Sequence, residues 1–273
     1  MQNKTIACII ARTVSTRLPI KVLRDLLPNV SMIEFLIKRL QSVERVDDIY
    51  ICTSKEPQDD IMEDISKRNN IKLYRGSADA VIERMLEVAK IENADYLIRI
   101  TGDNPLTSIE YLSKQITKAH EHNLDYVRLS NVPIGATAEV MKTEALIDCY
   151  KNIDPSVSEY LMLYMFNPDK YKCGVLVPFI DDTSNFSITV DTPDDLLRVK
   201  NILDYSTETD KQEIKLCEIV DILNRNLEGL PAKEIQRAGI VKLPYNNSMS
   251  FEEFNKDMIN RKTNSTQFNL YDE

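Results

Sequence analysis

Residues 5–23 read TIACIIARTVSTRLPIKVL, an apolar run followed directly by a polar, cationic stretch. The run Thr5–Ala11 has the length and continuous hydrophobicity of a strand that is buried on both faces of a sheet. The stretch after it carries three cations and two small hydroxyl residues, which are Arg12, Arg17, Lys21, Ser15 and Thr16. Because open α/β sheets bind ligands beyond the carboxyl ends of their strands, this composition indicates a polyphosphate site. A solvated connecting loop is the alternative interpretation.

The remainder of the first half repeats this alternation of short apolar runs and longer amphipathic segments. The expected strands are 48–53, 72–74 and 94–101, and the expected helices are 32–43, 57–68, 79–91 and 108–121. In the first of these helices Met32, Leu36 and Leu40 recur at helical spacing. The order of elements predicts an α/β fold with a mixed, mainly parallel sheet and helices on both faces.

The second half has a less regular pattern. Its expected strands are 125–129, 139–141, 173–177 and 186–190, and its expected helices are 143–151, 155–166, 193–204, 214–226 and 251–259. A charged patch at 206–215 separates the last region, and we expect a polar, mobile end from residue 260. The pattern therefore predicts a main domain, 1–205, and a C-terminal helical extension with a polar tail, 206–273.

Composition excludes several classes of protein. The 34 Lys and Arg residues against 43 Asp and Glu give a formal net charge of −9, which argues against a nucleic-acid binder. No apolar run approaches the ~18–20 residues that a membrane span needs, and the N-terminus does not resemble a signal peptide. The five cysteines include no CxxC pair, which favours free thiols in a cytoplasmic, reducing compartment. With only two histidines, a His-based triad or a zinc site is not expected.

Two carboxylates are expected at the same edge of the sheet as the cations. Asp103 follows the expected strand 94–101, and Asp191 follows the expected strand 186–190. Mg²⁺ is usually held by one or two carboxylates, with phosphate oxygens and water completing its shell. We therefore predict that Asp103 and Asp191 bind magnesium, with turn chemistry as the alternative.

The next acids along the chain have a simpler interpretation. Asp194 and Asp195 lie in the first turn of the expected helix that starts at Pro193, where negative charge is favourable. Thr192 is positioned to cap that helix. We therefore predict helix-start roles for these three residues.

Four motifs in a fixed order resemble a family of nucleotidyltransferases. They are AR-x-x-STRLP-x-KVL at 11–23, RGS at 75–77, ITGD-x-PL at 100–106 and VDTP-D-D at 190–195. Together they resemble the cytidylyltransferases of bacterial surface-sugar synthesis, in particular the branch similar to spore-coat polysaccharide synthesis protein F. Enzymes that make CMP-activated 3-deoxy-octulosonate and sialic-like acids are more distant relatives. The resemblance covers about residues 5–205.

The resemblance implies a Rossmann-like nucleotidyltransferase fold of the nucleotide-diphospho-sugar transferase type. It implies transfer of CMP from CTP to a sugar acid or a sugar or polyol phosphate, with release of pyrophosphate and with Mg²⁺ as cofactor. Such a reaction would serve the synthesis of surface polysaccharide or glycoconjugate. A homodimer is also implied, with residues 159–168 at the contact.

Carried over residue by residue, the resemblance assigns a site. The catalytic residues would be Arg12, Arg17 and Lys21, and Lys21 would neutralise charge that develops on the α-phosphate. The nucleotide would be held by Ala11, Arg12, Ser15, Thr16, Arg17, Lys21, Arg75, Gly76, Ser77 and Asp103. The acceptor would contact Gly135 and Glu139, and the metal would bind Asp103 and Asp191. Arg24 has no counterpart in the motif, and we interpret it as a surface cation.

The chain departs from the family pattern at several positions. Relatives usually have glycine at the position of Val14 and often at that of Ile20, and a β-branched residue restricts the backbone there. Asp79 and Ala80 stand where an acidic residue usually follows RGS. The pattern Gly-Leu-Asp-Val-Glu becomes GATAE at 135–139, so one acceptor-side carboxylate is absent.

These departures leave two alternatives open. The first is a glycosyltransferase of similar architecture that uses a nucleotide-sugar donor, although Thr101–Leu106 offers one Asp where such enzymes usually carry a D-x-D-like pair. The second is a catalytically degenerate homologue that only binds nucleotide, an interpretation that Val14 favours.

Overall fold

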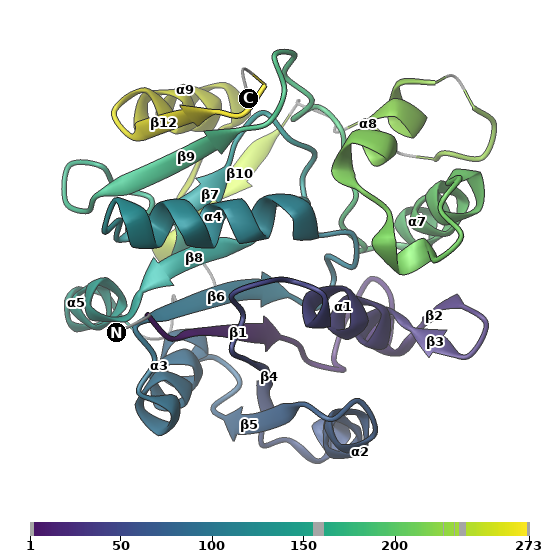
Figure 1. Cartoon of the computed structure of the whole chain (residues 1–273), viewed down its shortest axis with the longest axis horizontal. Helices are drawn as coiled ribbons and strands as arrows, with labels where there is room; N and C mark the ends of the chain where they lie inside the picture. The colour runs from purple at the N-terminus through teal and green to yellow at the C-terminus, as the bar shows by residue number, and fades with distance from the viewer. Residues whose placement is uncertain (1–2, 155–160, 226, 232, 235–238, 272–273) are drawn as a thin grey trace.

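The computed structural model describes residues 3–154, 161–225, 227–231, 233–234 and 239–271, and its centre is one eight-stranded sheet (Figure 1). The strand order is β12-β9-β7-β8-β6-β1-β4-β5, and β8 runs antiparallel to both of its neighbours. The strands are β1 (Thr5–Ile10), β4 (Asp48–Ser54), β5 (Lys72–Gly76), β6 (Tyr96–Thr101), β7 (Tyr126–Leu129), β8 (Glu139–Lys142), β9 (Cys173–Val177) and β12 (Thr266–Asn269). The predicted mixed, mainly parallel sheet is confirmed.

Helices connect most of these strands. They are α1 (Met32–Gln41), α2 (Ile61–Arg68), α3 (Val81–Glu92), α4 (Ile109–Glu121), α5 (Thr143–Asn152), α6 (Leu161–Met165), α7 (Pro193–Tyr205), α8 (Leu216–Asn224) and α9 (Phe251–Thr263). Short 3₁₀ turns lie at η1 (Lys21–Leu23), η2 (Pro57–Asp59), η4 (Lys211–Glu213) and η5 (Pro244–Asn246). Two small hairpins, β2 (Asp25–Leu27) with β3 (Val30–Ser31) and β10 (Ile240–Lys242) with β11 (Ser248–Ser250), stand outside the main sheet.

Alternate residues of each central strand face opposite sides of the sheet, because the side-chain period of a strand is two. Ile9 and Ile51 face the core that α1, α2 and α4 cover, whereas Cys8 and Cys52 face the core under α3, α5 and α6. All four side chains are completely buried. The continuous apolar runs of the sequence therefore correspond to strands buried on both faces.

The order of the strands predicts a ligand-binding crevice beside β1. From β1 the chain runs outward to β4 and β5 and then returns to β6 on the other side of β1. Connections on the two sides of such a reversal diverge, which opens a crevice at the carboxyl ends of the strands. The cationic segment after β1 and the Gly102–Asp103 turn after β6 both begin at this point.

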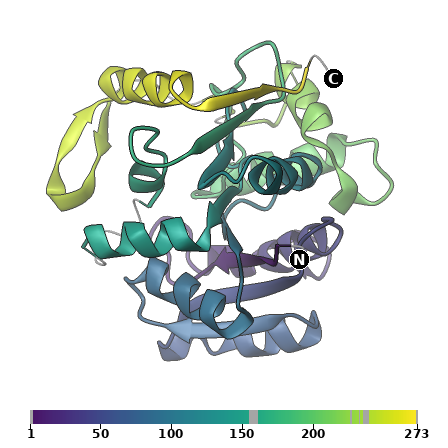
Figure 2. The ribbon, with the colours of Figure 1, turned by 60° about the vertical axis from the view of Figure 1, so that its left-hand side comes forward.

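The C-terminal part joins the same body. Arg39 of α1 is completely buried, and its guanidinium donates to the carbonyls of Thr107 and Ile214, each at 3.0 Å. Farther along, α9 and β12 lie together beside β9 (Figure 2). The division after residue 205 stays a prediction. Among the described ranges, no helix is long and apolar enough to cross a membrane.

The structure corrects two local predictions and tests a third only in part. The expected strand at 186–190 is not part of the sheet and makes only isolated bridges, to Ile134 and to Glu234. The mobile end expected from residue 260 is instead the last turn of α9 followed by β12, which pairs with β9. The expected helix at 155–166 is described only as α6, because residues 155–160 lie outside the described part.

Candidate active site

Cations and carboxylates from three distant segments converge in the crevice beside β1. The Lys21 ammonium donates to Oδ2 of Asp103 at 2.6 Å and to Oδ1 of Asp191 at 2.8 Å. A guanidinium nitrogen of Arg17 lies 3.0 Å from the same oxygen of Asp191. Four of the side chains that the resemblance assigns to the phosphates and the metal are therefore joined by direct contacts.

The path of the backbone after β1 places Lys21 there. Leu18 and Val22 are buried in the core on either side of the turn, which fixes the segment at two points. Between them Ile20 adopts a left-handed conformation with φ of 50° and ψ of 34°, directly before η1. That reversal directs Lys21 toward the carboxylates, whereas Arg24 remains exposed and donates to the carbonyl of Pro19.

Asp103 reaches the crevice because two chain segments approach closely. The amide of Gly102 donates to the carbonyl of Ile10 at 2.9 Å and extends the pairing of β6 with β1 past the strand end. A Cβ atom on Gly102 would lie 2.9 Å from the Cβ of Ala11, closer than side chains tolerate. Glycine at this position therefore allows the turn that carries Asp103 to lie against the start of the cationic segment.

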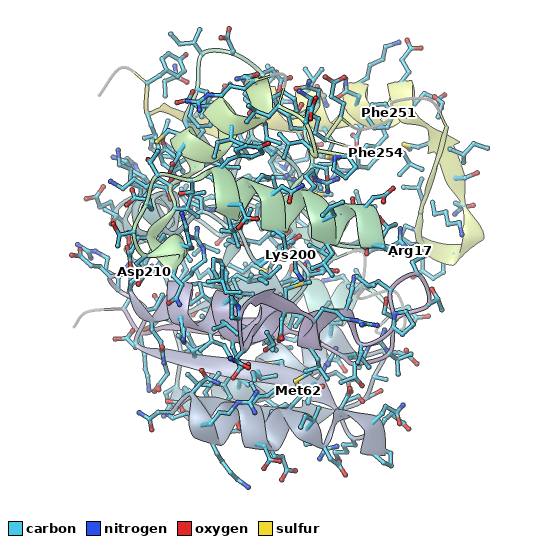
Figure 3. All side chains as sticks on the ribbon, turned by 90° about the vertical axis from the view of Figure 1, so that its right-hand side faces the viewer. Arg17, Met62, Lys200, Asp210, Phe251 and Phe254 are labelled. Atoms are coloured by element: carbon cyan, nitrogen blue, oxygen red, sulfur yellow. The ribbon has the colours of Figure 1, made fainter. Side chains whose placement is uncertain are left out.

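The segment that positions Asp191 differs from the strand that was expected. The segment 186–190 crosses the carboxyl edge of the sheet, where the amide of Ile188 donates to the carbonyl of Ile134 and that of Val190 to the carbonyl of Asp103. The second of these bonds, at 2.9 Å, sets Asp191 beside Asp103 without a further strand. Figure 3 shows Arg17 near the end of α7 that begins after Asp191, and Asp210 beyond its opposite end.

The start of α7 holds Asp191 in place. Thr192 accepts a hydrogen bond from the amide of Asp195, and Asp195 accepts bonds from the amides of Asp191 and Thr192. Asp195 also pairs with the buried Arg198 at 2.7 Å. The predicted helix-start roles of Thr192 and Asp195 are confirmed by this reciprocal capping.

A buried acid that the sequence analysis did not single out anchors the cationic segment. Asp59 is 1% exposed, and its Oδ1 accepts bonds from the amide of Thr13 at 2.8 Å and from its hydroxyl at 2.7 Å. The Ser54 hydroxyl donates to its other oxygen. Although burial opposes ionisation, these bonds hold the pKa of Asp59 below its ordinary value. The only sequence signal was an acid in a Pro-initiated turn after a strand.

The carboxylates fit a magnesium ion by the chemistry of their donor set. Asp103 and Asp191 each bring an oxygen within 3 Å of one nitrogen, so their oxygens converge on one small volume. Burial lowers the pKa of Lys21, but the two carboxylates outweigh it and raise its pKa above the ordinary value. Within the described residues, no group of three acid, His or Cys side chains forms a metal site, so bound phosphate would have to complete the shell.

The remaining predicted nucleotide ligands lie around the crevice or beyond it. Arg12 is exposed and lies 3.8 Å from Asp79, and Ser15 and Thr16 follow on the same segment. Arg75, on the outer strand β5, is engaged by carboxylates of the α2 region, since it pairs with Asp60 at 2.6 Å and with Glu63 at 2.9 Å. Gly76 ends β5 and Ser77 follows it. The nucleotide roles of all these residues stay predictions.

The two predicted acceptor ligands lie in different environments. Gly135 has a φ of 94° and packs against Asn104 and Thr189 at the edge of the crevice, so this position requires glycine. Glu139 is buried in β8, where its carboxylate accepts bonds from the hydroxyl of Tyr126 at 2.6 Å and from Arg99. Both oxygens of Glu139 are therefore used inside the sheet. Acceptor binding by either residue stays a prediction.

The chain is similar to known proteins both in sequence and in fold. A sequence model of the family described as cytidylyltransferase matches residues 6–171. An uncharacterised protein of Methanocaldococcus jannaschii is 32% identical over 82% of this chain and 91% of its own length. The spore coat polysaccharide biosynthesis protein SpsF of Bacillus subtilis is 30% identical over 85% of this chain and 99% of its own length. A solved cytidylyltransferase of Leptospira borgpetersenii covers 86% of this chain and 99% of its own, with a TM-score of 0.77 and 25% identity.

Proposed function

This chain belongs to the cytidylyltransferase family, and from that premise we propose that it transfers CMP from CTP to a sugar acid or to a sugar or polyol phosphate, with release of pyrophosphate. The observation that carries the proposal is the contact of Lys21 with Asp103 and Asp191 at the crevice beside β1. An oxygen of the acceptor would attack the α-phosphorus, and no protein nucleophile is needed. Positioning and charge stabilisation would supply the rate enhancement.

The basic residues would bind the triphosphate. In the structure Arg17 pairs with Asp191 and Lys21 pairs with Asp103 and Asp191, and the two cations would exchange these carboxylates for phosphate oxygens when CTP binds. Lys21 would then lie as a compact point charge beside the α-phosphate, where negative charge develops. Arg12 and the hydroxyls of Ser15 and Thr16 would hold the outer phosphates.

We propose Mg²⁺ as the cofactor, held by Asp103 and Asp191. A bound magnesium ion supplies electrophilic charge at phosphate oxygens. When Lys21 leaves the two carboxylates to bind phosphate, their oxygens would become free for Mg²⁺. Asp103 and Asp191 would thereby couple binding of the nucleotide to binding of the metal.

Val14 does not require the degenerate interpretation. Its side chain is 62% exposed, and Val14 is absent from the residues with positive φ. The backbone at this position therefore does not need glycine, and we infer an active enzyme over a degenerate binder. A single Asp at Thr101–Leu106, in place of a paired motif, also disfavours a glycosyltransferase.

Two finer assignments belong to the same proposal. We place the protein in the cytoplasm, which is supported by five cysteines that are all free, four of them buried. We also propose a homodimer through residues 159–168, of which 161–168 are described. This proposal rests on the resemblance, and the mass of the native protein in solution would test it.

A pyrophosphate-release assay tests the function. We expect turnover with CTP and a mixture of sugar acids and sugar phosphates in the presence of Mg²⁺, and lower turnover with UTP, GTP or ATP. Asp103→Asn and Asp191→Asn should lose most of that turnover, whereas Asp194→Asn, an exposed first-turn acid of α7, should keep it. Turnover only with a nucleotide-sugar donor would indicate a glycosyltransferase, and CTP binding without turnover a degenerate homologue.

A further inference from the structure

A second feature of the molecule, a large cavity beside the C-terminal helix, has no role in the proposed chemistry. Its volume is about 770 Å³, within the usual range for small-molecule sites. Its lining includes Arg128, Thr137, Met162, Phe254, Met258 and Lys262. We propose that this cavity binds an anionic sugar with an apolar substituent as the acceptor, so that α9 selects the substrate. This inference rests on the proposed function and extends it.

One face of α9 forms a wall of the cavity. Phe251, Phe254, Met258 and Lys262 follow one another by three or four residues, which places them on one side of a helix. Figure 3 labels the first two of them on this helix. None of the described residues of α9 is fully buried. Met258 packs against the edge of the core under α3, α5 and α6, and the partly exposed apolar side of the helix lines the cavity. The family match ends at residue 171, which makes this wall an addition to the matched part.

The opposite wall of the cavity is connected to the catalytic residues. Residues 129–135 line it, and within them Ile134 makes hydrogen bonds of 2.9 and 2.8 Å with Phe186 and Ile188. Those residues belong to the segment that ends at Asp191. Gly135, which also lines the cavity, packs against Asn104, next to Asp103. A ligand in the cavity would thus contact residues that are themselves hydrogen-bonded to, or packed against, the segments that carry both catalytic carboxylates.

The charges in the cavity favour an anion. Arg128 lies over the ring of Phe166 at 5.3 Å, and Lys262 donates to the side chain of Asn131 at 2.9 Å. Among the described side chains, neither cation has a carboxylate partner within 4 Å, and the lining contains one acid, Asp182. Two cations without carboxylate partners in a protein with a net charge of −9 mark a site for a negative group.

The apolar part of the lining determines the rest of the ligand. Phe166, Phe254, Met162 and Met258 surround the cations with aromatic and thioether groups, and thioether side chains adapt to irregular shapes. A fully hydroxylated sugar would leave this surface unmatched. Deoxy carbons or an N-acyl group on the sugar would bury it, while a carboxylate or phosphate reached Arg128 and Lys262.

The experiment measures both binding and turnover in the full-length protein. The probes are N-acetylneuraminate, 3-deoxy-manno-octulosonate and glucose 1-phosphate, each titrated calorimetrically and each tested as acceptor with CTP. We expect at least one sugar acid or sugar phosphate to bind. Lys262→Met and Arg128→Met should each weaken it about tenfold or more, as loss of a charge-assisted hydrogen bond predicts. CTP affinity should change less than about twofold.

A matched variant separates this site from a general effect of charge. Lys256→Met removes a cation from the exposed side of the same helix, where Lys256 pairs with Glu252, and it should leave sugar binding unchanged. Equal weakening by Lys256→Met, or no weakening by Lys262→Met and Arg128→Met, would overturn the proposal. So would loss of dimer mass in the two cavity variants, because the cavity would then hold a second copy.

The readouts also distinguish failure of this inference from failure of the proposed function. Binding of a probe that depends on Lys262 without any turnover would support the cavity and count against CMP transfer. Turnover with unchanged KM for the acceptor in Lys262→Met and Arg128→Met would support CMP transfer and count against the cavity. If the variants weaken binding of a sugar acid but not of the sugar phosphate, the cavity recognises a carboxylate. If they weaken binding of the sugar phosphate but not of a sugar acid, it recognises a phosphate. No binding by any probe would overturn the cavity.

Discussion

Two clusters of charge in this protein each join distant parts of the chain, yet they differ in access to solvent. Around Lys21 the exposed side-chain fractions are 14% for the lysine, 24% for Asp103 and 29% for Asp191. Around Glu139 they are 7% for the glutamate and 15% for Arg99, while Tyr126 is completely buried. The first cluster contains charges that a ligand can reach, whereas the second is closed.

The difference concerns which groups can change partners. In the Lys21 cluster two cations share two carboxylates, so each group can exchange its partner for a phosphate or a metal ion. In the Glu139 cluster, burial and the neighbouring carboxylate raise the pKa of Tyr126, which keeps its hydroxyl as a donor to Glu139. Exposure and exchangeable partners therefore distinguish these clusters better than residue type does.

The largest expected effect is on kcat, when the lysine of the Lys21 cluster is removed. Lys21→Ala should lower kcat about 10²- to 10³-fold, because charge stabilisation of this kind in the transition state is worth about 3–4 kcal/mol. Arg24→Ala removes an exposed cation three residues later and should stay within a few-fold of wild type. Initial rates at saturating CTP measure both variants. Equal losses would mean that the segment binds triphosphate by diffuse positive charge.

The next largest effect is on the free energy of unfolding, when the carboxylate of the Glu139 cluster is removed. Glu139→Gln leaves the guanidinium of Arg99 without its carboxylate partner, and loss of a hydrogen bond to a charged group costs about 1.5–3 kcal/mol. Denaturant unfolding should show this loss, whereas Glu144→Gln, which changes an exposed carboxylate that pairs with Lys142, should change little. A higher KM for the acceptor at unchanged stability would instead support the acceptor role that the resemblance implies.

Much of the fold and part of the site follow from the sequence. Continuous apolar runs such as Thr5–Ala11 identify strands buried on both faces, and the alternation with helices indicates a parallel sheet. Parallel strands on either side of a reversal end at one edge. The convergence of Lys21 with Asp103 could therefore be predicted before any coordinates.

The parts that the sequence did not predict depend on tertiary contacts. Phe186, Ile188 and Val190 are all buried, so their period-two pattern is genuine, but they pack over the edge of the sheet and not within it. The edge strand β12 is four residues long and mostly exposed, and it carries no strong pattern. The role of Asp59 exists only because Thr13, 46 residues earlier, folds back onto it.

A smaller effect concerns this anchor of the Lys21 segment. Asp59→Asn should lower the free energy of unfolding by about 1–2 kcal/mol, since the Thr13 bonds lose their charged acceptor. The pKa of Asp59 is lower in the folded protein than in the unfolded chain. Its contribution is therefore complete above the ordinary Asp pKa of about 3.9 and is lost as pH falls toward the folded value.

Unfolding curves at a series of pH values measure this contribution. The difference between wild type and Asp59→Asn should be constant near neutrality and should shrink below about pH 4. Asp64→Asn, an exposed acid of α2, serves as the matched control and should show a small difference at every pH. A difference that grows as pH falls would contradict the anchor.

The smallest expected effect is on the free energy of unfolding, when the left-handed residue before Lys21 is replaced by glycine. Ile20 holds a left-handed backbone, with φ of 50°, which costs a β-branched residue about 1–2 kcal/mol. Glycine adopts this conformation freely but loses roughly 0.5–1 kcal/mol more on folding. Ile20→Gly should therefore raise the free energy of unfolding by up to about 1 kcal/mol.

Two glycine variants serve as controls. Asn29→Gly changes a left-handed position that Asn tolerates, and Val14→Gly changes a position where φ is not positive, so neither should bring a gain in stability. A gain at Val14 would show that family glycines on this segment relieve something other than backbone strain. A gain at Ile20 alone would show that this chain orients Lys21 at a cost in stability.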